Sequence, residues 1–274
     1  MHNAIPDKRE NRYQQLAGWV FSRHYKPGDT SVRWKREELR SAAKELGIPL
    51  PKNLGDVLYA IRYRMPLPSV MLETAPAGFE WIVRSVGRSA YSFDLIPAQV
   101  RIAPNPALAV TKIPDATPEI IAASALGDEQ ALLALVRYNR LIDIFLGVTA
   151  YSLQNHLRTT AIGIGQVEVD EVYLAVDRFG RQFVLPVQAK GGADEIGITQ
   201  TEQDIAVCEE KWPDKICRPI AVQFADSGRI ALFELAIQNN QVRVRRESHY
   251  QLVPASVITR DDLAEYSHSA MVEG

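Results

Sequence analysis

Residues 165–192, GQVEVDEVYLAVDRFGRQFVLPVQAKGG, constrain the fold of this chain more than any other segment. The segment reads as two β-strands joined by a short turn, and the second strand is an apolar run that ends in polar residues. Side chains alternate between the two faces of a strand. Glu168 and Asp170 therefore share a face of the first strand, and Gln188 and Lys190 share a face of the second.

Pairing of these strands brings carboxylates, an amide oxygen and an ammonium to one end of a sheet. Oxygen ligands of this kind suit a hard divalent cation such as Mg²⁺, and a lysine beside them can hold an attacking water. This combination favours metal-assisted hydrolysis of a phosphodiester. The alternative is an exposed cross-strand pair of Asp170 and Lys190 that contributes little to stability.

An acid-bearing strand, a turn and a hydrophobic strand ending in (D/E/Q)-x-K resemble the PD-(D/E)xK nuclease superfamily over roughly residues 125–230. The resemblance implies that Asp170 is the central acid, that Gln188 occupies the metal-binding position before the lysine, and that Lys190 positions the water. No proline precedes Asp170, and Gln188 stands where an acid is commoner. Glu168 is the candidate for the missing carboxylate, so the expected metal ligands are Asp170, Gln188 and Glu168.

Members of this superfamily also place polar residues on the neighbouring helices. Exonuclease-like members have a glutamine on the helix after the lysine, and Gln200 and Gln203 occupy that region here. Other members have a glutamate on the helix before the acid strand, where this chain offers Gln154 and His156. A lone histidine such as His156 is more often a hydrogen-bonded structural residue than a catalytic base.

Composition sets the outer limits of these interpretations. The chain has 274 residues, 46% hydrophobic and 23% charged, which is ordinary for a globular protein. No apolar stretch reaches membrane-spanning length, and the first residues lack a signal-peptide pattern. Cys208 and Cys217 lack metal-site spacing, which indicates packing residues in a reducing cytoplasm.

The net charge of −2 conceals an asymmetry along the chain. Residues 1–100 contain 15 Lys+Arg and 10 Asp+Glu, whereas the remainder contains 16 and 23. A basic first third joined to an acidic remainder indicates an anionic partner for the first third.

The basic third has the pattern of a DNA-reading module. We expect one helix over Val32–Leu46 and a second over Leu54–Arg64, separated by a turn that contains Gly47 and Pro49. Two helices in this arrangement are typical of a helix-turn-helix, whose second helix enters the major groove. Two strand-like segments, 79–84 and 90–95, follow and look like the wing of a winged helix. The alternative is a small protein-interaction domain.

Basic, amide and aromatic side chains of this third are the candidates for contact with double-stranded DNA. On and before the second helix they are Lys52, Asn53, Tyr59, Arg62, Tyr63 and Arg64, and on the hairpin they are Arg84 and Arg88.

Five prolines between Pro97 and Pro118 predict a semi-extended linker. Beyond it we expect an apolar helix over 130–146, a polar helical stretch over Thr149–Thr160, the two strands, a helix over Thr199–Cys208, and strands near 220–224, 230–235 and 242–246. The expected division is a DNA-recognition domain at 1–97, a linker at 98–118, a catalytic domain at 119–260 and a C-terminal tail at 261–274.

The fold that the resemblance implies is a restriction-endonuclease-like mixed sheet flanked by helices, of the α+β or α/β class, after a small winged helix-turn-helix domain. The implied activity is sequence-specific cleavage of double-stranded DNA with Mg²⁺, for which Mn²⁺ can substitute, as in type II restriction endonucleases. Such enzymes usually act as homodimers, because two strands are cut by two symmetric sites. A structure-specific repair or recombination nuclease and a non-catalytic winged-helix regulator are the alternatives.

Overall fold

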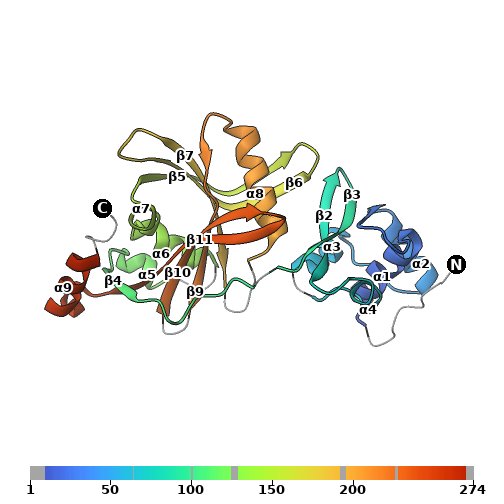
Figure 1. The fold of residues 1–274 in the computed structure, drawn as a ribbon, viewed down its shortest axis with the longest axis horizontal. Helices are drawn as coiled ribbons and strands as arrows, with labels where there is room; N and C mark the ends of the chain where they lie inside the picture. The colour runs from blue at the N-terminus through green and yellow to red at the C-terminus, as the bar shows by residue number, and fades with distance from the viewer. Residues whose placement is uncertain are drawn as a thin grey trace.

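The computed structural model describes residues 10–63, 65–99, 101–124, 129–191, 196–225 and 228–269. Over these ranges the chain is a mixed α+β protein with four clusters of buried hydrophobic side chains. The N-terminal part lies at one end of the long axis, and the C-terminal part, with a large curled sheet, lies at the other (Figure 1).

The N-terminal part consists of helices packed on a three-stranded antiparallel sheet of order β1-β3-β2. Its elements are α1 (Arg12–His24), β1 (Ser31–Lys35), α2 (Glu38–Leu46), α3 (Gly55–Tyr63), α4 (Ser69–Leu72), β2 (Phe79–Gly87) and β3 (Ala90–Pro97). Aromatic side chains pack at the centre of this part. The centre of the Phe21 ring lies 5.1 Å from that of Trp81 and 5.7 Å from that of Phe93.

The expected helix over Val32–Leu46 is wrong in its first part. Residues Ser31–Lys35 form β1, in which Val32 and Trp34 are buried and their neighbours are exposed. This two-residue period belongs to a strand, and pairing with β3 satisfies its backbone. The helix begins only at Glu38 and ends at Gly47, whose φ of 66° is the left-handed conformation that glycine adopts readily.

The C-terminal part is built on an eight-stranded mixed sheet. Its strands are β4 (Val110–Pro114), β5 (Thr149–Ala161), β6 (Gly165–Val176), β7 (Gln182–Lys190), β8 (Ile216–Cys217), β9 (Ile220–Ala225), β10 (Arg229–Gln238) and β11 (Gln241–Val253). Its helices are α5 (Glu119–Ala122), α6 (Glu129–Tyr138), α7 (Leu141–Leu146), α8 (Ile198–Lys211) and α9 (Arg260–Ser269), and Ala255–Val257 form a 3₁₀ turn.

The order across the sheet is β4-β11-β10-β9-β7-β6-β5, and β8 pairs with β7. Strands β5, β6 and β7 are antiparallel neighbours, whereas β9 runs parallel to β7 after the crossover through α8. A parallel pair requires such a crossover.

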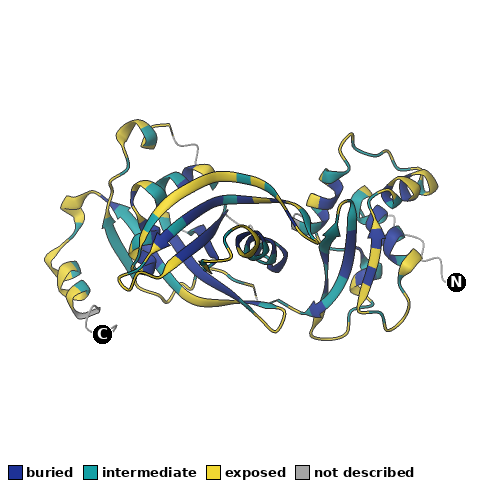
Figure 2. Ribbon diagram, turned by 90° about the horizontal axis from the view of Figure 1, so that it is seen from above, coloured by how far each residue is buried: buried dark blue, intermediate teal, exposed yellow. Residues whose placement is uncertain are grey.

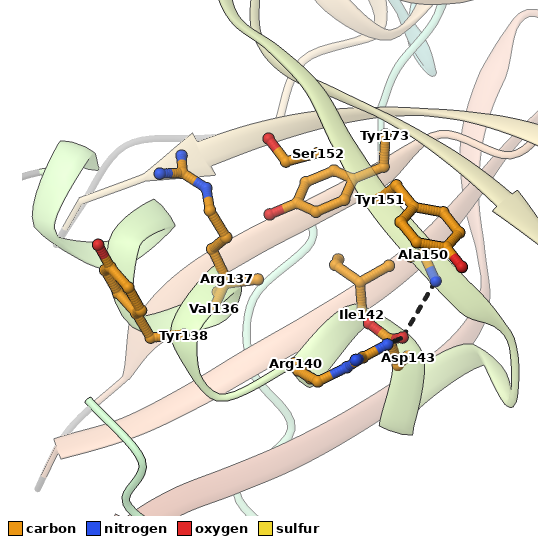
Figure 3. A pocket seen from close by; sticks show the side chains of 10 residues that line it. All are labelled: Val136, Arg137, Tyr138, Arg140, Ile142, Asp143, Ala150, Tyr151, Ser152 and Tyr173. Atoms are coloured by element: carbon orange, nitrogen blue, oxygen red, sulfur yellow. Dashed lines mark hydrogen bonds and ion pairs between the residues drawn. The ribbon is translucent and has the colours of Figure 1, made fainter. Parts of the chain in front are cut away.

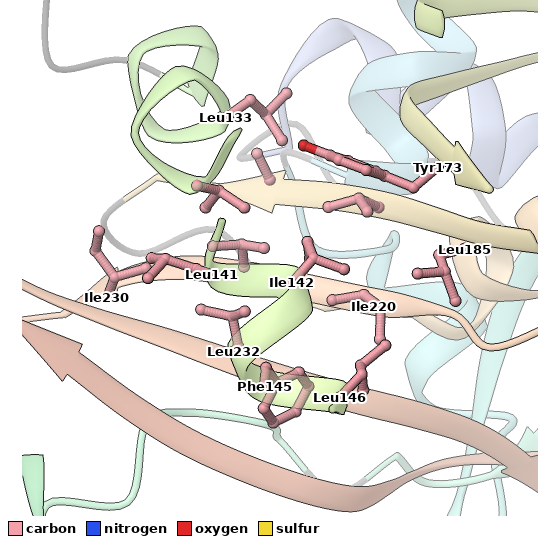
Figure 4. Close-up of a cluster of buried hydrophobic side chains, with 14 of the residues drawn as sticks. Leu133, Leu141, Ile142, Phe145, Leu146, Tyr173, Leu185, Ile220, Ile230 and Leu232 are labelled. Carbon is pink, nitrogen blue, oxygen red and sulfur yellow. The ribbon is translucent and has the colours of Figure 1, made fainter. Parts of the chain in front are cut away.

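Helices cover both faces of this sheet. Leu133, Leu141 and Phe145 of α6 and α7 pack on one face against Leu185 and other strand residues (Figure 4). On the other face, Val207 and Cys208 of α8 pack against Val172 and Val184. Figure 2 shows α8 nearly end-on, between the sheet and the N-terminal part. Neighbouring residues of β7 thus serve opposite cores, as strand alternation requires.

Other boundaries expected from the sequence also change. The expected helical stretch over Thr149–Thr160 is the edge strand β5. The apolar helix over 130–146 is two helices, because Arg140 adopts φ 52° and the side chain of Asn139 donates to Leu135 O (2.9 Å) and Thr117 Oγ1 (2.8 Å). The expected linker contains β4, which pairs with β11.

The expected C-terminal tail contains α9, which is attached to β4. Lys112 Nζ donates to both carboxylate oxygens of Asp262 at 2.9 Å. The Tyr266 hydroxyl accepts from Lys112 N (3.0 Å) and donates to Lys112 O (3.1 Å).

Candidate active site

Three of the predicted site residues meet where β6 and β7 face the first turns of α8. The register of β6 with β7 ends at the Glu171–Val187 pair. One residue before it, Asp170 Oδ2 accepts a hydrogen bond from Ala189 N at 2.9 Å, so the carboxylate takes a backbone donor of β7. Gln188 and Lys190, on either side of Ala189, point to the α8 face. The strand alternation expected from the sequence therefore brings Asp170, Gln188 and Lys190 to one end of the sheet.

Lys190 and Gln188 are both held by α8. Lys190 Nζ donates to Gln200 Oε1 at 2.6 Å. Gln188 is 1% exposed, and its Nε2 donates to Thr201 Oγ1 at 3.2 Å. Gln188 Oε1 is buried without a hydrogen-bond partner among the described residues. A buried acceptor left in this state costs free energy unless a cation or water completes it.

Asp204 is the site residue that the sequence reasoning missed. It lies on α8 four residues after Gln200, hence on the same helix face, and it is 1% exposed. Its Oδ1 has no hydrogen-bond partner in the described part of the chain. Burial and the nearby charge of Asp170 raise the pKa of Asp204 well above its usual value, and Lys190 opposes this shift. The four-residue spacing from Gln200 was the only signal in the sequence.

Asp170 experiences the same environment more weakly. Burial raises its pKa, while the Ala189 N–H and the Lys190 ammonium lower it. Burial therefore disfavours ionisation of both carboxyl groups, and the charge of Asp170 adds to this effect at Asp204.

Glu168 lies beside this cluster but is turned to the surface. Its carboxylate pairs with His156 Nδ1 at 3.4 Å and with Arg158 Nε at 3.2 Å. The negative charge of Glu168 also raises the pKa of Asp170. Glu168 is therefore a neighbour of the buried oxygens, with surface partners of its own.

The other polar candidates, Gln154, His156, Gln200 and Gln203, fall into two groups. Gln154 and His156 lie exposed on β5, on a strand where a helix was expected. Gln200 contacts Lys190 directly, and Gln203 is buried on α8.

The oxygens of this cluster are of the type that a small hard cation prefers. Mg²⁺ is commonly bound through one or two carboxylates and keeps several waters. Asp170 and Asp204 are the two carboxylates, and Gln188 Oε1 is an amide oxygen. Among the described residues, no group of three or more His, Cys, Asp or Glu side chains is arranged to hold a metal ion.

The candidates for DNA contact differ in their exposure and in their partners within the protein. Lys52, Asn53, Tyr59 and Arg88 are exposed. Asn53 supports the start of α3: its Oδ1 accepts from Gly55 N at 2.9 Å and its Nδ2 donates to Asp56 at 2.9 Å. Arg64 and the side chain of Tyr63 lie outside the described residues.

Two arginines of that set are engaged within the protein. Arg62 Nη2 donates to Ser85 Oγ at 2.9 Å, and its guanidinium lies 5.4 Å from the centre of the Tyr91 ring. Arg84 is paired with Asp94 and Glu202. The packing of the N-terminal part gives both side chains a structural role. This packing could not be predicted from the sequence.

A separate pocket of about 390 Å³ lies on the opposite face of the sheet (Figure 3). Arg137 Nε donates to the fully buried Glu171 at 2.9 Å, and Ser152 Oγ donates to the same oxygen at 2.6 Å. Burial and the Glu171 carboxylate raise the pKa of the Tyr173 phenol. Arg137 pairs with Glu171 and Arg140 pairs with Asp143, so each of these two carboxylates has an arginine partner.

The Arg137–Glu171 pair should be important for stability. Replacing Arg137 with methionine leaves the Glu171 carboxylate buried without its cation, and breaking such a pair costs about 3–5 kcal/mol. Urea unfolding of the variant should report a loss in this range. The control is Arg140→Met, which removes a largely exposed arginine from the same pocket and should leave the stability unchanged. Equal stability of the two variants would contradict the assignment.

Comparison of this chain with protein-family models, with curated proteins and with solved structures finds no match. No helix in the described ranges has the length and apolar character needed to cross a membrane.

Proposed function

We propose that this protein is a Mg²⁺-dependent DNA endonuclease of the PD-(D/E)xK type, similar to type II restriction endonucleases. The observation that carries the proposal is the convergence of Asp170, Gln188, Lys190 and Asp204 between β6, β7 and α8. Two of these residues have a buried oxygen without a partner among the described residues, and the lysine is held by Gln200.

The order of the elements supports the same proposal. Helices α6 and α7 precede β5, β6 and β7, and then α8 leads into β9, parallel to β7. The central acid lies on β6 and the Gln-x-Lys sequence ends β7, which is the arrangement that the resemblance implies.

In this proposal the residues of the chain have distinct roles. Asp170, Asp204 and the Gln188 amide oxygen would hold the cation, and Mn²⁺ would substitute for Mg²⁺. When bound, the cation would polarise the phosphate and lower the pKa of a water molecule. Lys190 would orient the attacking water through its ammonium, whose direction Gln200 fixes. The backbone N–H of Ala189 would aim the Asp170 carboxylate.

The N-terminal part would bind the DNA. Its order α1-β1-α2-α3-α4-β2-β3, with β3 central in the sheet, supports a winged helix-turn-helix in which α3 is the reading helix. Lys52, Asn53, Tyr59 and Arg88 are its exposed candidates for DNA contact. Cleavage of both strands would require two sites, which a symmetric homodimer provides.

The test is incubation of the purified protein with plasmid DNA and Mg²⁺, with EDTA as the control. Discrete fragments in Mg²⁺ alone support the restriction-type activity. A smear indicates a nuclease that recognises DNA structure, or one that cuts DNA without specificity. Intact plasmid under both Mg²⁺ and Mn²⁺, together with DNA binding, indicates a winged-helix regulator.

Gln188 gives a second prediction. If its carbonyl oxygen is a metal ligand, Gln188→Glu should retain or increase the rate of cleavage, because a carboxylate binds Mg²⁺ better than an amide does. Gln188→Ala removes the oxygen and should lose activity. Thr201→Val serves as a comparison, since it keeps the Gln188 oxygen but removes the hydroxyl that accepts from the amide nitrogen and donates to Gly197 O. Equal cleavage rates for the Glu, Ala and wild-type proteins would show that this oxygen binds no metal.

A further inference from the structure

The β2–β3 hairpin of the N-terminal part is joined to α8 by a bidentate ion pair. Arg84 Nε donates to Glu202 Oε2 at 2.7 Å, and Arg84 Nη2 donates to Glu202 Oε1 at 2.6 Å. The two side chains are 21% and 24% exposed. A bidentate guanidinium–carboxylate pair fixes both distance and orientation, which a single contact does not.

The arginine is itself anchored within the N-terminal sheet. Arg84 Nη1 donates to Asp94 Oδ2 at 3.2 Å. Asp94 in turn accepts from Ser31 Oγ at 2.6 Å and from Ser92 Oγ at 3.0 Å. All three strands of that sheet therefore contribute to the position of the guanidinium.

The other end of the pair is the helical turn that holds the candidate site. Glu202 follows Gln200 and Thr201, which bind Lys190 and Gln188, and precedes Asp204. A shift of this turn would therefore move the partners of Lys190 and Gln188 together.

Apolar contacts join the two parts at the same place. Ile96 and Ile82 of the hairpin pack in one cluster with Ile196 and Ile198, at the start of α8. At the hairpin tip, the backbone of Gly87 approaches Gly165 so closely that a Cβ on Gly165 would lie 3.4 Å from Gly87 O. The N-terminal part thus braces both α8 and the start of β6.

We propose that Arg84 is a positioning residue for the candidate active site: through Glu202 it fixes the turn of α8 that holds Lys190. This inference rests on the proposed nuclease function for its kinetic consequence. It replaces the expectation that Arg84 contacts a DNA phosphate. Two carboxylates already neutralise its guanidinium, and a phosphate would have to displace one of them.

The test compares Arg84→Ala, Glu202→Ala and the double variant, with Arg88→Ala as the matched control. Each single variant should lower kcat by on the order of 10–10²-fold with an unchanged Kd for DNA, because misplacement of a catalytic group costs rate. The double variant should be no slower than the singles. Arg88→Ala should instead raise Kd and reduce the salt dependence of binding by about 0.9 in log–log slope.

A second readout makes the result independent of cleavage. The acylation rate of Lys190 by an amine-reactive reagent, measured by mass spectrometry, should change equally in Arg84→Ala and Glu202→Ala and remain at the wild-type value in Arg88→Ala. Arg84→Lys, which keeps the charge but cannot form the bidentate pair, should resemble Arg84→Ala.

The outcomes separate the two proposals. Changed Lys190 reactivity in a protein that cuts no DNA would refute the nuclease function and leave the positioning role standing. A rise in Kd for Arg84→Ala, with normal kcat and normal Lys190 reactivity in Glu202→Ala, would overturn the positioning role.

Discussion

Replacing Asp170 with asparagine should reduce DNA cleavage by on the order of 10²–10⁴-fold while leaving the fold intact. The change removes the charge of a metal-binding carboxylate but keeps an oxygen that can accept the Ala189 N–H. Lys190→Met should cause a loss of similar size, because it removes the ammonium that Gln200 orients. Single-turnover cleavage of a labelled duplex, with circular dichroism as the check of folding, measures both effects.

Glu168→Gln is the matched control for Asp170→Asn. Glu168 lies two residues away on the same strand, but its carboxylate is engaged by His156 and Arg158 at the surface. We expect this variant to cut within a few-fold of wild type. A folded Asp170→Asn or Lys190→Met protein that cuts at the wild-type rate would remove these residues from the site, and a Glu168→Gln loss equal to that of Asp170→Asn would restore Glu168 as a metal ligand.

Asp204→Asn should abolish cleavage and, in EDTA, raise the melting temperature. Burial raises the pKa of Asp204 in the folded protein, so at neutral pH folding either protonates this carboxyl or buries its charge. The asparagine avoids that cost, and each kcal/mol regained raises Tm by about 2–4 °C in a protein of this size. If Asp204 were a purely structural, well-paired aspartate, the same substitution would lower Tm.

The pH dependence follows from the same shift. A carboxyl whose folded pKa lies above its unfolded value, about 3.9, binds more protons in the folded state. Stability that is present below pH 3.9 is therefore lost as the pH rises towards the folded pKa of Asp204. Melting curves in EDTA should show wild type losing stability relative to Asp204→Asn across this window. Parallel curves for the two proteins would contradict the assignment.

The parts of the fold that the sequence predicts are those with a strong hydrophobic period. Strands β6, β7 and β9 to β11 and helix α8 lie where the patterns placed them. Strand β5 was mistaken for a helix because it forms the edge of the sheet and is exposed on most of its residues, so no alternation of apolar side chains marks it. Strand β1 was absorbed into the following helix, since only Val32 and Trp34 reveal its two-residue period.

The same distinction applies to the candidate site. Asp170, Gln188 and Lys190 were predictable together because alternation and strand pairing are local rules. Asp204 was not, because its burial and its proximity to Asp170 depend on how α8 crosses the sheet. The surroundings of Arg84 also depend on tertiary packing. Its side-chain type suggests a DNA contact, but the packing of the hairpin on α8 places it beside Glu202.

The most direct test of the central claim is Mn²⁺ binding to the metal-free protein, followed by electron paramagnetic resonance. The account predicts a saturable site in wild type and in Glu168→Gln. Affinity should fall by about tenfold or more in Asp170→Asn and in Asp204→Asn, since each loses one of the two buried carboxylates. Identical Mn²⁺ binding by all four proteins, or no saturable binding by wild type, would contradict the assignment of a metal site between β6, β7 and α8.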